Sequence, residues 1–162
     1  MTTTVVRADY DAPEHQRQIV ELLDIYARDP MGGGEPLSAT TREALLPGLK
    51  AQPNAFSLIA YADGKPAGLA NCFFGFSTFA AKPLINIHDV IVDPAFRGQG
   101  VATALFEEIE DIAKASDACK VTLEVLSGNA PARKLYASLG YGDYALDPEA
   151  GTALFWQKRV AA

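Results

Sequence analysis

Apolar and polar residues follow one another along the chain in two patterns, one typical of strands and one typical of helices. Short apolar runs and alternation at every second residue predict strands, whereas apolar residues three or four positions apart predict one face of a helix. We therefore expect strands over residues 4–9, 56–62, 66–76, 84–92, 120–126 and 152–160, and helices over about 13–28, 38–50, 98–116 and 129–139. This order, β-α-α-β-β-β-α-β-α-β(β), predicts the α+β (mixed αβ) class, with a mixed sheet flanked by helices.

Glycine and proline mark the two clearest breaks in this pattern. Asp63-Gly64-Lys65 separates two apolar runs, and Asp-Gly in such a position is a strong hairpin signal. Residues 30–36 hold three glycines and two prolines, which disfavour both helix and strand, so we expect a loop there. The glycines would permit this loop to act as a mobile lid.

The stretch from Asp93 to Ala102 carries the strongest chemical signal. It follows an apolar strand and turns through Gly98 and Gly100 into an amphipathic helix. Unpaired backbone N–H groups and the positive end of the helix dipole meet at such a start, which makes it an anion site, and phosphate is its usual occupant. No acidic residue follows Asp93 until Glu107, so the positive end of the helix stays free for an outside anion.

A second segment with a chemical signal runs from Leu123 to Tyr141. It contains a strand end, then Asn129, then a helix that Gly140 stops. Asn129 is a natural N-cap for this helix. Tyr136 lies beside the apolar face of the helix, so its ring can be half-buried while its hydroxyl stays available. Packing is the alternative role for Tyr136.

The two segments together fit the motifs of a known family. Arg97, Gly100 and Ala102 fit the pattern Arg/Gln-x-x-Gly-x-Gly/Ala, and the second segment fits Asn followed by a helix with Ala-x-x-Leu-Tyr-x-x-x-Gly-Tyr/Phe. The chain thereby resembles the GNAT superfamily of N-acetyltransferases, whose order of elements is similar over essentially the whole length. The resemblance implies a single GNAT domain over residues 1–162 with a mostly antiparallel sheet. A diamine-acetyltransferase-like branch is one option within the family.

The resemblance also implies a donor, a reaction and a set of residue roles. The donor would be acetyl-CoA, and a primary amine would attack its thioester directly. A backbone N–H near residues 90–92 would bind the oxyanion, and Tyr136 would protonate the departing thiolate. The acetyl-CoA site would comprise Val90, Ile91, Val92, Arg97, Gly98, Gln99, Gly100, Val101, Ala102, Asn129 and Tyr136.

The acceptor side has several candidates. His88 and Asp89 adjoin the oxyanion strand and are the candidates for the general base. Histidine titrates near neutral pH, which suits His88, but members similar to diamine acetyltransferases carry an acid at that position. Strict alternation would put the two side chains on opposite faces of the strand, so only one could face the substrate. By the resemblance, the loop over residues 31–36 would form one wall of the acceptor pocket, and a flexible surface connection is its alternative role. We therefore expect Gly33, Glu35, His88 and Glu124 to bind the amine. A packing or structural role is the alternative for His88 and Glu124.

Length, charge and targeting signals narrow the function classes. A chain of 162 residues suggests one domain, and a net charge of −6 argues against nonspecific nucleic-acid binding, which needs clustered Lys and Arg. The longest uncharged stretch, residues 66–81, is too short and too polar to span a membrane. The first ten residues lack the pattern of a signal peptide. We therefore expect a cytoplasmic protein with no membrane contact.

The remaining expectations concern thiols, metals and partners. Cys72 and Cys119 sit among apolar or strand-forming residues, so both are expected to be buried thiols. With only two histidines in the chain, we expect no metal site. We expect a small-molecule amine rather than a protein as the acceptor, and a homodimer is left open. The main alternative is a sensor that binds acyl-CoA without turnover, and a structural protein with a degenerate site is the third class.

Overall fold

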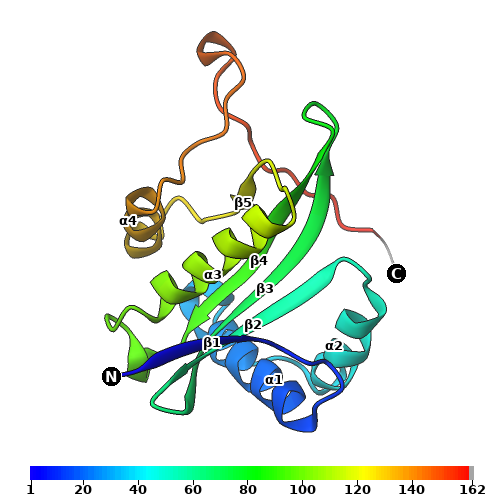
Figure 1. Cartoon of the computed structure of the whole chain (residues 1–162), viewed down its shortest axis with the longest axis vertical. Helices are drawn as coiled ribbons and strands as arrows, with labels where there is room; N and C mark the ends of the chain where they lie inside the picture. The colour runs from blue at the N-terminus through cyan, green and yellow to red at the C-terminus, as the bar shows by residue number, and fades with distance from the viewer. Residues whose placement is uncertain (161–162) are drawn as a thin grey trace. The chain divides into compact units, whose positions relative to one another are not determined.

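The fold is built on one five-stranded sheet with helices on both of its faces (Figure 1). The computed structural model describes residues 1–160. The strands are β1 Thr3–Arg7, β2 Ala55–Ala62, β3 Lys65–Ser77, β4 Lys82–Val92 and β5 Val121–Leu123, and the α-helices are α1 Pro13–Arg28, α2 Ala39–Ala51, α3 Val101–Ala115 and α4 Ala130–Ser138. Short 3₁₀ turns lie at Pro30–Gly32, Pro94–Phe96 and Pro148–Ala150. None of the helices in the described range is both long and apolar enough to cross a membrane.

The strands lie side by side in chain order. All neighbouring pairs are antiparallel except β4–β5, which is parallel. This confirms the predicted mixed and mostly antiparallel sheet. The predicted hairpin joins β2 and β3, and its turn residues Asp63 and Gly64 both have positive φ (48° and 77°). Two consecutive residues with positive φ make a turn whose twist matches that of the paired strands.

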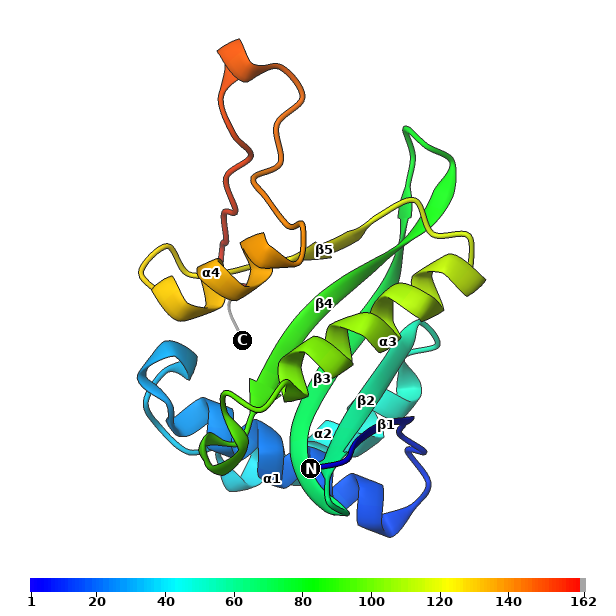
Figure 2. The same cartoon turned by 60° about the vertical axis from the view of Figure 1, so that its left-hand side comes forward.

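The helices of this sheet form two layers. α3 covers one face, and α1 and α2 cover the other (Figures 1 and 2). α3 lies close to the sheet because Gly68 on β3 has no side chain; a Cβ there would lie 2.8 Å from Cγ1 of Val101. Leu105 and Ile109 of α3 are fully buried, as the helical spacing of apolar residues predicts. The core on the α1–α2 face comprises Ile19, Leu22, Leu46, Leu49, Ile59, Leu69 and Ile91.

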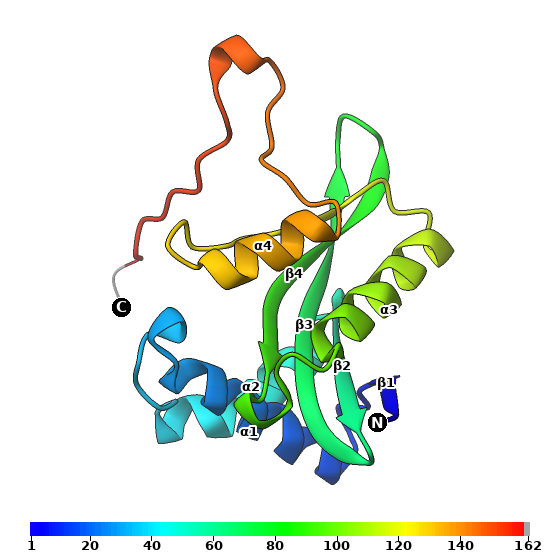
Figure 3. The ribbon, with the colours of Figure 1, turned by 90° about the vertical axis from the view of Figure 1, so that its left-hand side faces the viewer.

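The chain divides into two compact units, Met1–Glu124 and a second unit that begins at Val125. The second unit holds α4, and the predicted cap is confirmed because the Asn129 side chain accepts a hydrogen bond from the N–H of Ala132. After α4 the chain is irregular up to residue 160, apart from the turn at Pro148–Ala150 (Figure 3). One domain over residues 1–162 stays a prediction.

The closing strand predicted over residues 152–160 is wrong. No residue from 141 to 160 lies in a strand, although the N–H of Ala153 donates to the carbonyl oxygen of Tyr144 over 2.8 Å. A strand is stabilised by a neighbour that pairs with it, and the described part of the second unit offers no strand for this role. Phe155 and Trp156, which suggested the strand, are accordingly 77% and 82% exposed.

Smaller differences concern element ends and one cysteine. β1 begins and ends earlier than predicted, and β5 ends at Leu123 because it pairs with β4 over three residues. The loop over residues 30–36 is present but opens with a 3₁₀ turn, Pro30–Gly32. Cys72 is buried as predicted, but Cys119 is exposed. The prediction for Cys119 is wrong because this residue lies in the link between α3 and β5, outside the pleated part of the sheet.

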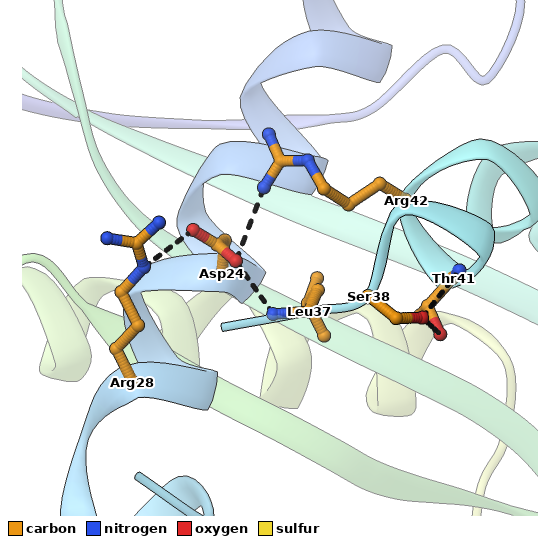
Figure 4. Close-up of polar contacts among 6 residues, drawn as sticks. All are labelled: Asp24, Arg28, Leu37, Ser38, Thr41 and Arg42. Carbon is orange, nitrogen blue, oxygen red and sulfur yellow. Dashed lines mark hydrogen bonds and ion pairs between the residues drawn. The ribbon is translucent and has the colours of Figure 1, made fainter. Parts of the chain in front are cut away.

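Asp24 on α1 ties the following segment and α2 to that helix (Figure 4). Its Oδ2 accepts a hydrogen bond from Nε of Arg28 (2.9 Å), while Oδ1 accepts from the N–H of Leu37 (2.9 Å) and lies 3.2 Å from Nη1 of Arg42. The Asp24 side chain is only 9% exposed. Burial alone would raise the pKa of Asp24, but the Leu37 amide and the charges of Arg28 and Arg42 outweigh it, so this pKa lies below its usual value.

We predict that Asp24→Asn lowers the free energy of unfolding at pH 7 by about 1–3 kcal/mol, because the negative charge between Arg28 and Arg42 is lost and the amide offers one acceptor oxygen where the carboxylate offers two. The lowered pKa of Asp24 means that its contribution is present above the ordinary value of 3.8 and is lost as pH falls through the lower folded value. Urea unfolding at pH 7 and near pH 3 checks this, and the difference between variant and parent should shrink at low pH.

A matched control for Asp24→Asn is Glu21→Gln, which removes a carboxylate from the exposed Arg17–Glu21 pair on the same helix. Such surface pairs contribute less than about 1 kcal/mol, so this variant should unfold close to the parent. Equal losses from both substitutions would show that Asp24 is an ordinary surface charge.

Candidate active site

The register of β4 slips by one residue at His88. Asn71 of β3 lies opposite Asp89, whereas the next residue, Cys72, lies opposite Ile87. His88 is therefore an extra residue in β4, a β-bulge. A bulge bends the strand and re-aims its side chains, and bulges are common beside active sites.

The bulge puts His88 and Asp89 on the same face of the sheet. The His88 ring packs edge-on against Phe73, with ring centroids 5.7 Å apart, and Oδ2 of Asp89 accepts a hydrogen bond from Nδ2 of Asn71 (3.0 Å). Asn71 and Phe73 are two residues apart on β3, so they point to the same face, the one that α1 and α2 cover. The prediction of opposite faces is wrong because the extra residue interrupts the alternation, and both side chains can serve one site.

β4 and β5 part at this bulge. Their parallel pairing ends at Ile87 and Leu123. In the part of the chain that the structure describes, residues 88–92 of β4 have a strand neighbour on one side only, β3. The predicted oxyanion donors, residues 90–92, lie in this part. Glu124, the residue that follows the last paired residue of β5, is exposed, and its predicted part in binding an amine stays a prediction.

The segment after β4 forms the helix start that the sequence predicts as an anion site. Gly98 and Gly100 have φ of 73° and 82°, the left-handed region that favours glycine. A Cβ at either position would meet no other atom within 4 Å, so there is open space beside both. Gly100 is the N-cap of α3 and supplies no side-chain cap, and the first turn holds no acidic residue. The first-turn amides and the helix dipole are therefore left for an outside acceptor.

Arg97 links this helix start to the segment after α1. Its Nη2 donates to Oδ2 of Asp29 over 3.3 Å, and its Nε donates to the carbonyl oxygen of Val92 over 3.4 Å. The other oxygen of Asp29 accepts a hydrogen bond from the N–H of Met31 (2.9 Å). The Met31 amide, opposed by partial burial and aided by Arg97, holds the pKa of Asp29 below its usual value. Asp29 thus contacts both Arg97, beside the predicted anion site, and Met31 in the glycine loop (residues 30–36).

The glycine loop folds back on the end of α1. The N–H of Glu35 donates to the carbonyl oxygen of Ala27 over 3.1 Å. Gly32 lies against the backbone of Tyr26, where a Cβ would be 2.0 Å from the carbonyl oxygen, so only glycine fits. Gly33 and Glu35, the predicted acceptor residues of this loop, are exposed. Their part in binding an amine stays a prediction.

A row of polar side chains crosses three strands and ends at Asp89. Ser57 of β2, Asn71 of β3 and Asp89 of β4 lie directly opposite one another. Oγ of Ser57 donates to Oδ1 of Asn71 over 2.6 Å, and the Tyr10 hydroxyl lies 2.8 Å from the same Oγ. Ser57 is 0% and Asn71 3% exposed. Sequence analysis missed this row, because single polar residues within apolar strands reveal neither their pairing nor their burial.

The pKa of the Tyr26 hydroxyl on α1 is raised above its usual value. Burial raises the pKa of the Tyr26 hydroxyl, and the negative charges of Asp89 and Asp29 raise it further. The charges of both carboxylates therefore act on the Tyr26 hydroxyl. Sequence analysis assigned no role in the site to Tyr26. Among residues 1–160, His, Cys, Asp and Glu side chains do not gather in threes or more where they could hold a metal ion.

The last two predicted site residues, Asn129 and Tyr136, lie in the second unit. Asn129 is the N-cap of α4. The Tyr136 ring is tilted against that of Tyr141, with centroids 6.5 Å apart, and the carbonyl oxygen of Tyr136 accepts a hydrogen bond from the N–H of Tyr141 (3.0 Å). The roles of Asn129 and Tyr136 toward acetyl-CoA stay predictions.

Comparison with known proteins decides the family. The model of the acetyltransferase (GNAT) family matches residues 19–141, a range that includes β4, the glycine-rich helix start and α4. The chain belongs to the GNAT family. Members of this family are acyltransferases.

Individual relatives of this GNAT protein share part of its length. It is 30% identical over 90 residues to the thialysine N-epsilon-acetyltransferase of Bos taurus, covering 52% of each chain. It is 35% identical over 86 residues to the streptothricin acetyltransferase of Streptomyces lavendulae, covering 53% of this chain and 43% of that one. The chain thus spans about half the length of these curated relatives.

A solved structure has a similar fold. The ribosomal-protein-alanine N-acetyltransferase of Brucella melitensis biovar Abortus 2308 matches with a TM-score of 0.69 at 18% identity, over 99% of each chain. At this identity the likeness shows the fold alone. It confirms the predicted fold class, with a mostly antiparallel sheet between helices.

Proposed function

We propose that this chain is an acetyl-CoA-dependent N-acetyltransferase that transfers the acetyl group to a primary amine. The observation that carries the proposal is the start of α3, where two left-handed glycines lead into a helix with no side-chain cap and no first-turn acid. Such a start binds anions. In a GNAT protein the pyrophosphate of CoA is the anion expected there.

The donor site that we propose is made largely of backbone. The amides of residues 97–102 would hold the pyrophosphate, and the open space beside Gly98 and Gly100 supports a close approach. Arg97 would add a positive charge. By the family resemblance, Asn129 would bond the pantetheine arm of the donor. All of these groups bind and orient the donor, and none reacts with it.

Acetyl transfer needs a neutral amine. An alkylamine has a reference pKa of about 10.4, so roughly one molecule in a few thousand is neutral at pH 7. A group near the acceptor must therefore take a proton, directly or through water. His88 and Asp89 are the candidates, and the bulge that turns both toward one face supports either.

The attack of the neutral nitrogen on the thioester would create an oxyanion. A backbone N–H within residues 90–92 is the proposed donor to that oxygen, since this part of β4 has a strand partner on one side only among the described residues. Collapse of the intermediate would release the thiolate of CoA. Tyr136 is the proposed acid that protonates it.

A small-molecule amine is the acceptor that we propose. The carboxylates of Asp29 and Asp89 near Tyr26 would attract an ammonium group, and Gly33, Glu35 and Glu124 are proposed to contribute to the same site. Two of the relatives are named for thialysine and for streptothricin, which supports a small amine. A protein N-terminus is the alternative, since the Brucella structure is named for a ribosomal-protein alanine.

The test of the proposed function is a screen of amines with the full chain and acetyl-CoA, in which free thiol is measured. The panel holds alkyl diamines, amino acids, aminoglycosides and an alanine-terminated peptide. Thiol release that depends on a small amine supports the proposal, and release with the peptide alone would change the acceptor class. Binding of acetyl-CoA without thiol release for any amine would favour an acyl-CoA sensor, and absence of binding would overturn the donor assignment.

We predict that Ala102→Glu weakens acetyl-CoA binding by at least about tenfold, or 1.4 kcal/mol, because it puts a carboxylate beside the phosphates. Isothermal titration calorimetry measures this directly. The matched control is Ala115→Glu, which adds the same charge at the exposed far end of α3 and should leave the affinity within about twofold. Unchanged affinity in a folded Ala102→Glu protein would place the phosphates elsewhere.

We predict that Tyr136→Phe lowers the single-turnover rate of acetyl transfer by about 10²–10⁴-fold, the usual range for loss of a general acid. The ring is kept, so folding should change little. The affinity for acetyl-CoA should also change little, because the phosphates carry the anchoring. Single-turnover rates are the measurement of choice, since a slow later step would hide the loss in kcat.

The control for this experiment is Tyr141→Phe, which removes the hydroxyl of the aromatic neighbour of Tyr136. It should acetylate at about the parent rate. If Tyr136→Phe also reaches the parent rate, Tyr136 serves packing and water protonates the thiolate.

A further inference from the structure

The polar row through Ser57 and Asn71 occupies interior positions that apolar residues fill elsewhere on this face. The row two residues further along the same strands consists of Ile59, Leu69 and Ile91, all in the core. Buried polar side chains stabilise a fold less than apolar side chains of the same size, unless every partner is satisfied. A polar row at this place therefore indicates a use beyond packing.

The hydrogen bonds in the row all point one way. The Asp89 carboxylate only accepts, so the Asn71 amide must turn its NH₂ toward Asp89, over 3.0 Å. Its oxygen then accepts the single hydroxyl proton of Ser57 over 2.6 Å. Ser57 has no second proton, so the Tyr10 hydroxyl must donate to it over 2.8 Å. Each donor thus fixes the next, and the row ends on one oxygen of Asp89.

The row ends at the Asp89 carboxylate, next to the bulge in β4. Asn71 engages Oδ2 of Asp89, which leaves Oδ1 to a second partner. Asp89 is partly exposed and its neighbour His88 is exposed, so a ligand can reach this point. The charge of Asp89 also raises the pKa of Tyr26 across the α1 face. A carboxylate that is fixed on one side and reachable on the other is suited to hold an ammonium group in a set direction.

We propose that Asp89 binds the ammonium group of the acceptor and that Asn71, held by Ser57 and Tyr10, is the positioning residue that orients the Asp89 carboxylate for it. This inference rests on the proposed function and deepens its acceptor side. Asn71 touches neither acceptor nor donor and acts through Asp89. The acceptor class that the arrangement selects is a cationic amine over a neutral molecule of the same shape.

The test is a binding experiment on the full chain without acetyl-CoA. The probes are n-butylammonium chloride at pH 7 and n-butanol as its uncharged counterpart, and the readout is the shift of the backbone amide resonances of residues 88–90. The parent should bind the cation in preference to the alcohol. Asp89→Asn, which can keep the hydrogen bond to Asn71, should lose that preference.

The positioning role is tested by Asn71→Ala against a matched control. Asn71→Ala should weaken binding of the cation at least about tenfold and leave binding of the alcohol within about twofold. Asn86→Ala removes another half-buried amide from the same face of β4, one that bonds Thr122 instead, and should bind both probes like the parent. A purely structural role for Asn71 would weaken both probes together or neither.

A second variant covers the case in which Asn71→Ala does not fold. Asn71→Ser keeps a polar group for Ser57 but is too short to reach Asp89, so it should show the same selective loss. If either folded Asn71 variant keeps the parent's preference for the cation, or if the parent has none at residues 88–90, the proposal is overturned. Selective binding of the cation without thiol release in the amine screen would refute the acetyltransferase proposal and leave only a cation site at Asp89 that Asn71 orients.

Discussion

The single extra residue in β4, His88, determines how the sheet of this protein meets its candidate acceptor site. A shift of register by one residue moves every following side chain to the opposite face of a sheet. With the bulge, Ile87 packs on the α3 side while Ile91 joins the α1–α2 core. Without it, Ile91 would leave that core and Asp89 would turn away from Asn71. The bulge therefore lets β4 contribute apolar side chains to the cores on both faces of the sheet. At the same point it places the Asp89 carboxylate and the His88 imidazole side by side.

Fixed contacts on the α1–α2 face support this arrangement. Asp24 joins α1 to the segment that leads into α2, and Gly32 lies against the Tyr26 carbonyl where no larger residue fits. Asp29 holds the same loop through the Met31 amide. Side chains that are held by several partners keep a site in one geometry, which recognition of a small polar ligand requires. The glycine loop is thus held at its start, by Met31 and Gly32, and the exposed Gly33 and Glu35 come after these fixed residues in the chain.

Local chemistry was predictable from the sequence, whereas pairing was not. The hairpin at Asp63-Gly64, the cap at Asn129 and the acid-free start of α3 follow from neighbouring residues alone, and the structure has all of them. The bulge depends on which residue of β3 faces which residue of β4, and no local pattern encodes that. The polar row was missed for the same reason, since Ser57 and Asn71 look like ordinary strand residues until their burial and pairing are known. The strand predicted over 152–160 shows the converse, because a strand-like sequence needs a neighbour to pair with.

Arg97, which precedes the start of α3, forms a weak ion pair with Asp29, which follows α1. Its guanidinium contacts Asp29 at 3.3 Å, but the two side chains are 56% and 28% exposed. Exposed ion pairs of this kind contribute about 0–1 kcal/mol. A charge-assisted bond from Arg97 to a phosphate would offset that loss, since guanidinium groups bind phosphate strongly. Arg97 can therefore turn toward an anion at the start of α3 at little cost, because the contact that it gives up is a weak one.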